Sequence, residues 1–210
     1  ILESFHPDLE TCHRWNQEYN LIPIYKEVLI DTETPITLYQ KLKEEESTCF
    51  LLESAEGGEK WGRYSFIGLR PFLTAEAKNG LFTVKEADGT VEVVRKNPLK
   101  ALKELLSRYR SPAQAEGPRF TGGAVGYLGY DVLRYVEKLP PHAQDDLKVS
   151  DFLLLFCDRV IVVDHYRHRM RVYVNLHLEV GSSMETLRQA YQAGCQEIEA
   201  LLKRLARPGS

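Results

Sequence analysis

The chain has 210 residues, 43% of them hydrophobic, so it is long enough for one large domain or two small ones. Its 27 Lys and Arg are outnumbered by 30 Asp and Glu, and the net charge of -3 excludes the basic footprint of a nucleic-acid-binding protein. No apolar run approaches the length of a membrane span and no signal peptide is present, so we expect neither a membrane protein nor a secreted one.

The first half of the chain predicts two helices and a series of strands. Thr34 and Pro35 have the types preferred at a helix N-cap and at the first helical position. Asn79-Gly80 and Asp88-Gly89 separate three strand candidates and suit tight hairpin turns. The predicted helices cover residues 7–19 and 34–45, and the predicted strands cover residues 21–31, 49–52, 64–69, 72–78, 81–86 and 90–94.

The second half continues the same mixture. Asn97-Pro98 predicts the start of a helix, and glycines are spaced through a strand-like run at residues 120–130. Glycine inside a strand indicates a bulge or another backbone passing closely, and this spacing does not fit a dinucleotide-binding loop. Further elements are a helix at 131–139, a long strand at 152–164, a strand at 170–178 and a last helix opened by Ser182 with Glu185 as its capping box. Hairpins with scattered helices indicate an α+β fold with largely antiparallel sheets covered by helices.

The four cysteines and six histidines give no metal-binding pattern. The cysteines lie far apart, without a CxxC pair, at positions 12, 49, 157 and 195. His165, His168 and His177 lie on a turn and on the polar side of a strand, which is typical of solvated histidines. Free thiols are simplest to explain in a reducing cytoplasm, so we predict a cytoplasmic protein.

One connection carries an unusual set of side chains. An apolar run ends at Glu53 and Ser54, Gly57-Gly58 loosens the backbone, and Trp61, Arg63 and Tyr64 follow. A carboxylate, a hydroxyl, a cation and two aromatic rings suit the head group and ring of an amino acid. The same residues also suit a capped turn beside a covered core edge, since loops carry polar residues without function as well.

This stretch resembles anthranilate synthase component I. The resemblance lies in Leu-Leu-Glu-Ser at 51–54 and Trp-Gly-Arg-Tyr-Ser-Phe-Ile-Gly at 61–68, and it continues in order through most of the chain. The further matching segments are 24–27, 31–35, 122–131, 137–140 and 151–165.

The resemblance implies a role within a larger enzyme. That family is a lyase that converts chorismate and ammonia into anthranilate and pyruvate with magnesium, in tryptophan biosynthesis, and a glutamine amidotransferase subunit (component II) supplies the ammonia. Its chorismate, magnesium and catalytic residues lie in a C-terminal domain that we expect beyond Ser210, so we assign none here and expect this segment alone to be inactive. Residues 1–206 would form the amino-terminal regulatory domain, and residues 207–210 the start of a linker or an appended tail.

The resemblance also assigns an allosteric site. Ser54 matches the family serine at which the feedback inhibitor L-tryptophan binds, and Glu53 is the expected ammonium partner. Arg63, Tyr64 and Trp61 match the second wall of that site. Two alternatives stay open at this point: the amino-terminal domain of aminodeoxychorismate synthase component I, and a non-enzymatic amino-acid sensor module.

Overall fold

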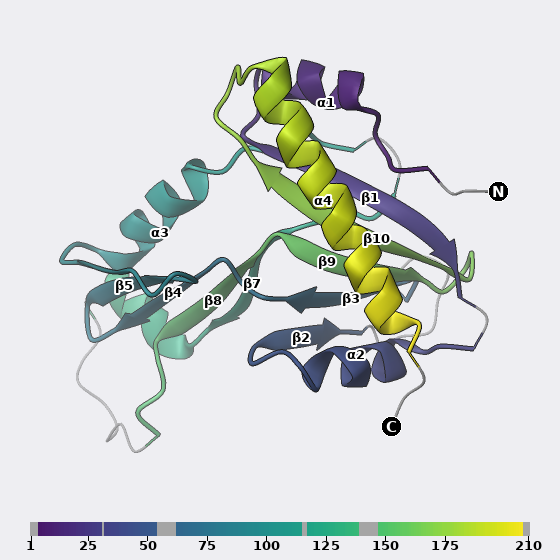
Figure 1. Ribbon diagram of the computed structural model, residues 1–210. Helices are drawn as coiled ribbons and strands as arrows, with labels where there is room; N and C mark the ends of the chain where they lie inside the picture. Colours follow the sequence, from purple (N-terminus) through teal and green to yellow (C-terminus); the bar gives the residue numbers. More distant parts are fainter. Residues whose placement is uncertain (1–3, 31, 54–61, 115–116, 139–146, 208–210) are drawn as a thin grey trace. The chain divides into compact units, whose positions relative to one another are not determined.

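The chain builds two antiparallel sheets, each in its own compact unit (Figure 1). The computed structural model describes residues 4–30, 32–53, 62–114, 117–138 and 147–207. Unit 1 comprises residues 1–70, 109–123 and 158–210, and unit 2 comprises 71–108 and 124–157. The α+β prediction with largely antiparallel sheets covered by helices is therefore confirmed.

The sheet of unit 1 has the strand order β1-β10-β9-β3-β2, and every pairing in it is antiparallel. Its strands are β1 (Leu21–Leu29), β2 (Cys49–Leu52), β3 (Tyr64–Leu69), β9 (Arg159–Asp164) and β10 (Arg169–His177). Side chains alternate between its two faces, as strand geometry requires. The face bearing Ile24, Ile67 and Val172 forms the core of unit 1.

Three helices cover this core face. They are α1 (Leu9–Asn16), α2 (Pro35–Lys43) and the 22-residue α4 (Met184–Leu205). Gly194 of α4 makes the close approach possible, because a Cβ there would lie 2.6 Å from Leu176 Cδ2 and 2.8 Å from Ile24 Cδ1. Figure 1 shows α4 lying across β1 and β10.

The sheet of unit 2 has the order β6-β5-β4-β8-β7. Its strands are β4 (Leu73–Lys78), β5 (Leu81–Glu86), β6 (Val91–Val94), β7 (Gly123–Leu128) and β8 (Phe152–Cys157), accompanied by α3 (Pro98–Ser107) and a 3₁₀ helix, η1 (Tyr130–Tyr135). The hairpin turns lie where the sequence predicts them, with Asn79, Gly80 and Gly89 at positive φ. Another backbone passes close to Gly126, as the glycine inside this strand predicts, because a Cβ there would lie 1.9 Å from the carbonyl oxygen of Leu153.

Several predicted elements need correction. The strand expected over 152–164 divides at Asp158 into β8 and β9, which belong to different sheets. The helix expected at 131–139 is only the 3₁₀ turn η1, because its hydrogen bonds close over three residues, as from Val136 N to Leu133 O. Strand β2 is an edge strand and therefore only partly buried, whereas its apolar sequence predicts a buried one.

Smaller corrections concern helix ends and faces. Ser183, not Ser182, caps α4 by accepting a hydrogen bond from Thr186 N at 3.1 Å. Helix α1 begins after Asp8, which is its N-cap, so Pro7 precedes the helix. Ile36 of α2 is 52% exposed although its side chain is apolar.

The four cysteines are free thiols in the structure. Burial raises the pKa of Cys12 to about 12 and that of Cys195 to about 11, so both thiols stay protonated near neutral pH. Cys157 is buried, whereas Cys49 on the edge strand is only partly buried.

Candidate functional site

Glu53 leaves the end of β2 and meets two partners from other segments. The hydroxyl of Ser65 on β3 donates a hydrogen bond to Glu53 Oε1 at 3.4 Å. His165, just after β9, has its Nε2 2.7 Å from the same hydroxyl oxygen. Ser65 is 1% exposed, whereas Glu53 is exposed, so a buried hydroxyl holds a carboxylate that solvent can reach.

Arg63 and Tyr64 form a second group around Asp164. Arg63 binds Asp164 in bidentate fashion, with Nε 3.1 Å from Oδ1 and the terminal nitrogen 2.7 Å from Oδ2. Its guanidinium also lies over the rings of Tyr64, at 4.9 Å, and Tyr166, at 5.7 Å. Burial alone would raise the pKa of Asp164, but the hydrogen bonds and charge of Arg63, together with hydrogen bonds from the backbone N–H groups of Arg167 and Tyr166, outweigh it and lower that pKa.

A cavity of about 270 Å³ adjoins this second group. Its lining residues are Arg63, Tyr64, Gly117, Arg167 and Arg171. Arg171 is held by Glu27, whose carboxylate accepts a hydrogen bond from its Nε at 2.6 Å. Gly117 is required there, since its φ is +113° and a Cβ would lie 2.6 Å from an Arg171 nitrogen. Arg63 and Arg171 are each already paired with a carboxylate, Asp164 and Glu27, so the charge that they present to the cavity is largely neutralised.

The two groups lie on opposite faces of one end of the unit 1 sheet. Ser65 pairs with Val163, a core residue, and Tyr64 pairs with Asp164 on the other face. The register of β2 with β3, continued by one residue, places Glu53 opposite Ser65. The structure thus brings Arg63 and Tyr64 together and places Glu53 apart from them, with Ser65 and His165. The predicted site residues Ser54 and Trp61 lie outside the described residues.

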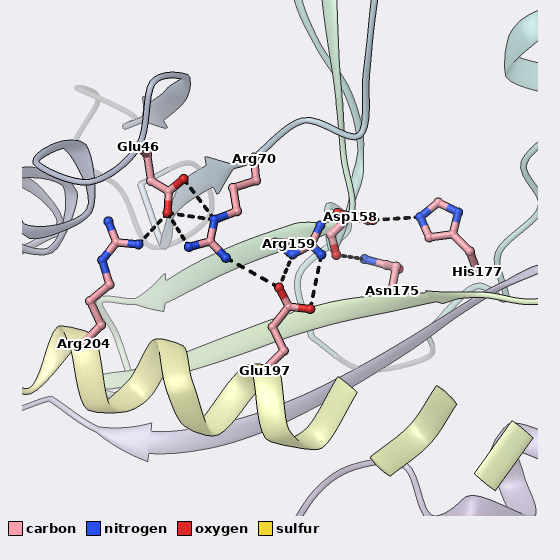
Figure 2. Close-up of polar contacts among 8 residues, drawn as sticks. All are labelled: Glu46, Arg70, Asp158, Arg159, Asn175, His177, Glu197 and Arg204. Carbon is pink, nitrogen blue, oxygen red and sulfur yellow. Dashed lines mark hydrogen bonds and ion pairs between the residues drawn. The ribbon is translucent and has the colours of Figure 1, made fainter. Parts of the chain in front are cut away.

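An ion-pair network, unforeseen from the sequence, runs along the same unit (Figure 2). At one end Glu46 accepts hydrogen bonds from Arg70, at 2.9 and 3.0 Å, and from Arg204 of α4. Arg70 also lies 3.9 Å from Glu197 of α4, which in turn pairs with Arg159. The side chain of Glu46 is only 6% exposed, so this carboxylate depends on its two cations.

The other end of the network centres on Asp158. Its carboxylate accepts a hydrogen bond from Arg159 at 2.6 Å and lies 2.8 Å from His177 Nε2. Its backbone carbonyl accepts a hydrogen bond from the side-chain amide of Asn175 at 3.1 Å. Figure 2 shows Arg159, Asp158 and His177 one after another, with Asn175 beside Asp158. Asn175, on the strand face predicted to be polar and open, is instead only 5% exposed.

The network holds unit 1 where its chain leaves for unit 2 and returns. Arg70 is the last residue of the first segment of unit 1, and Asp158 is the first residue of its third segment. The middle segment is held at both ends, since the Tyr109 ring lies 6.4 Å from that of His177 and Thr121 O accepts a hydrogen bond from Asn175 at 2.8 Å. The network therefore includes residues at two of the boundaries of unit 1, Arg70 and Asp158.

Two of the histidines, His165 and His177, face polar side chains. His177 faces Asp158 and His165 faces Ser65. Among the described residues, no group of three or more His, Cys, Asp or Glu side chains is arranged to hold a metal ion. In the same part of the chain, no helix combines the length and apolar composition that crossing a bilayer requires.

Sequence reasoning missed Ser65, His165 and Asp158. Ser65 and Asp158 do carry a local signal, because each is a polar residue inside an otherwise apolar run. Their partners, by contrast, are not indicated by spacing: Ser65 and His165 are 100 residues apart.

Comparison with known proteins identifies relatives over most of the chain. No family model matches. Anthranilate synthase component 1 of Acetivibrio thermocellus is 42% identical over 174 residues, which cover 83% of this chain and 35% of the relative. The Pseudomonas putida protein of the same name is 40% identical over 196 residues, which cover 90% of this chain and 38% of the relative. The Aquifex aeolicus protein of the same name is 33% identical over 202 residues, which cover 96% of this chain and 40% of the relative.

A solved structure shares the fold. It is anthranilate synthase component I from Streptococcus pneumoniae, with a TM-score of 0.54 and 23% sequence identity, over 87% of this chain and 37% of that chain. The chain thus spans well under half the length of the curated relatives it matches, and the match lies in their amino-terminal part. On these identities and this coverage, the chain belongs to the anthranilate synthase component 1 family.

Proposed function

We propose that this chain is the amino-terminal regulatory region of an anthranilate synthase component I, the lyase that forms anthranilate and pyruvate from chorismate and ammonia. The observation that carries the proposal is the 42% identity to a protein of that name over 83% of the chain. In this proposal residues 1–206, with both compact units, form the regulatory region, and residues 207–210 begin a linker or tail.

The chemistry is divided between this chain and the part of its relatives that it does not span. Chorismate, the magnesium ion and the catalytic residues belong to that other part, so the chain alone is inactive. A glutamine amidotransferase subunit supplies ammonia and contacts the amino-terminal region. The proposed compartment is the cytoplasm, which suits four free thiols.

The proposed regulatory ligand is L-tryptophan, with Glu53 and Ser54 at its ammonium group. Glu53 suits this role because its carboxylate is exposed and accepts a hydrogen bond from the buried Ser65. The resemblance gives Arg63, Tyr64 and Trp61 to a second wall, but Arg63 and Tyr64 line the cavity of about 270 Å³ on the other face of the sheet, so the proposed contact with the ligand head group rests on Glu53 and Ser54. Inhibition then requires that tryptophan binds better to a conformation of the enzyme that is poor at binding chorismate.

The test is Ser54→Arg in the full-length protein. A bulky cation in place of the hydroxyl should repel the ligand ammonium, so the tryptophan concentration for half-inhibition should rise at least tenfold, or about 1.4 kcal/mol. Ammonia-dependent anthranilate formation without tryptophan should stay within about twofold of the wild type, because under this proposal Ser54 takes no part in catalysis.

The matched control is Ser107→Arg, at an exposed serine of α3 in unit 2. It should leave tryptophan inhibition unchanged. Unchanged inhibition in Ser54→Arg itself would remove Ser54 from the site, and an enzyme without chorismate-dependent activity in any variant would contradict the proposed function.

A further inference from the structure

Ser65 is a buried hydroxyl placed between two ionisable side chains that come from distant parts of the sequence. Glu53 follows β2, and His165 follows β9. Neighbouring residues of the same parity on β3 are Ile67 and Leu69, both fully buried in the core of unit 1. Burying a serine in this row of apolar side chains costs free energy unless its hydroxyl is hydrogen-bonded.

The tautomer of His165 sets the directions of the two hydrogen bonds at Ser65. A serine hydroxyl has one proton to donate and two lone pairs with which to accept. The bond to Glu53 Oε1, which can only accept when ionised, is the longer of the two at 3.4 Å. In the tautomer that carries a proton on Nε2, His165 donates to Ser65 Oγ at 2.7 Å, and the hydroxyl proton remains for Glu53.

The result is a relay from His165 Nε2–H through the Ser65 hydroxyl to the Glu53 carboxylate. The Ser65 hydroxyl thus orients one oxygen of a carboxylate whose residue is exposed to solvent. Fixing a carboxylate before a ligand binds reduces the entropy lost on binding.

We propose that Ser65 and His165 are positioning residues that orient the Glu53 carboxylate for the ammonium group of an α-amino acid. This inference rests on the proposed function, since it takes Glu53 to be the ammonium partner. It adds a specificity determinant: the pair governs recognition of the amino group and leaves recognition of the indole ring to other residues.

The experiment compares two inhibitors of the full-length enzyme, tryptophan and indole-3-propionate, which lacks the amino group. In Ser65→Ala the concentration of tryptophan for half-inhibition should rise about tenfold, the value of a charge-assisted hydrogen bond near 1.4 kcal/mol. Inhibition by indole-3-propionate should change less than twofold. A merely structural loss of Ser65 would weaken both inhibitors alike.

Conservative variants and a double-mutant cycle test the positioning role further. Ser65→Thr keeps the hydroxyl and should restore most of the preference for tryptophan, and His165→Gln keeps an N–H donor and should do the same where His165→Leu does not. In a Glu53→Gln background, Ser65→Ala should have little further effect, because the group it positions is gone. His168→Asn, in the same turn and at a position with φ of +51°, is the matched control and should change neither inhibitor.

The outcomes separate this inference from the proposed function. If the wild type prefers tryptophan over indole-3-propionate and Ser65→Ala keeps that preference, the positioning role is wrong while the tryptophan site stands. If the wild type shows no inhibition by tryptophan, the proposed function fails, and this inference fails with it.

Discussion

Glu46 shows at the scale of one residue how the ion-pair network depends on pH. Burial alone would raise the pKa of Glu46, but hydrogen bonds from Arg70 and Arg204 outweigh it and lower the pKa below the ordinary value of 4.5. A carboxylate whose pKa is lower in the folded state stabilises the fold fully above its unfolded pKa. That contribution is lost as the pH falls through the folded pKa.

We therefore predict that Glu46→Gln lowers the free energy of unfolding by about 1–3 kcal/mol at pH 7, because two guanidinium groups lose a buried charged partner. The difference from the wild type should shrink as the pH falls below about 4.5, where the wild-type carboxylate begins to be protonated in the unfolded chain. Urea denaturation between pH 7 and pH 3 measures both effects. In the exposed Glu185–Arg188 pair, Glu185→Gln should cost about 0.5 kcal/mol or less, and an equal loss at both positions would contradict the argument.

At the scale of one element, the start of α4 shows which of two adjacent serines is the N-cap. The sequence favours Ser182 as the cap, through the spacing to Glu185, whereas in the structure Ser183 accepts the hydrogen bond from Thr186 N. The hydroxyl of Ser182 donates instead to the carbonyl of Glu179, at 2.6 Å in an exposed place.

Ser183→Ala should therefore destabilise the protein by about 1 kcal/mol, the typical loss for an N-cap. Ser182→Ala should cost less than half of that, because water can replace its exposed bond. Thermal unfolding of the two variants under identical conditions makes the comparison. If Ser182→Ala were instead the more destabilising variant, Ser182 and not Ser183 would be the N-cap of α4.

Elements governed by local chemistry were predictable from the sequence. Thr34 and Asn97 cap α2 and α3 as expected, and Asn79-Gly80 turns the β4–β5 hairpin. The predictions that were wrong concern features that depend on tertiary contacts. The run at residues 152–164 divides at Asp158, whose partners Asn175 and His177 are distant in sequence, so its spacing does not indicate the division. The apolar sequence of β2 likewise cannot say that the strand lies at the edge of its sheet.

The candidate site was predictable only through resemblance. Glu53, Ser54, Trp61, Arg63 and Tyr64 attract attention as a polar and aromatic set, but their chemistry alone also suits a turn. Alternation along β3 places Tyr64 and Ser65 on different faces, and the pairing with β9 brings His165 to Ser65. Such pairing across 100 residues follows from the fold and not from any local pattern.

At the scale of the whole molecule, the chain should bind or regulate without catalysing. It spans 35% to 40% of the curated relatives compared above, and we place the chorismate chemistry in the remainder. We predict no anthranilate formation when the 210-residue chain is given chorismate, ammonium and magnesium. Anthranilate fluorescence over time is the measurement, and the full-length protein is the positive control. Turnover above the buffer background would place catalytic residues within this chain.

The two interruptions of unit 1 have a consequence for how the protein is made. Strand β1 pairs with β10, so that Leu21 lies opposite His177, and β10 is its sheet partner among the described strands. On a ribosome, β1 is therefore synthesised long before the strand that satisfies its backbone hydrogen bonds. The hairpins β4–β5 and β5–β6, whose partners are adjacent in sequence, can close meanwhile. The core of unit 1 is thus assembled only after β10 and α4, which covers it, have been synthesised.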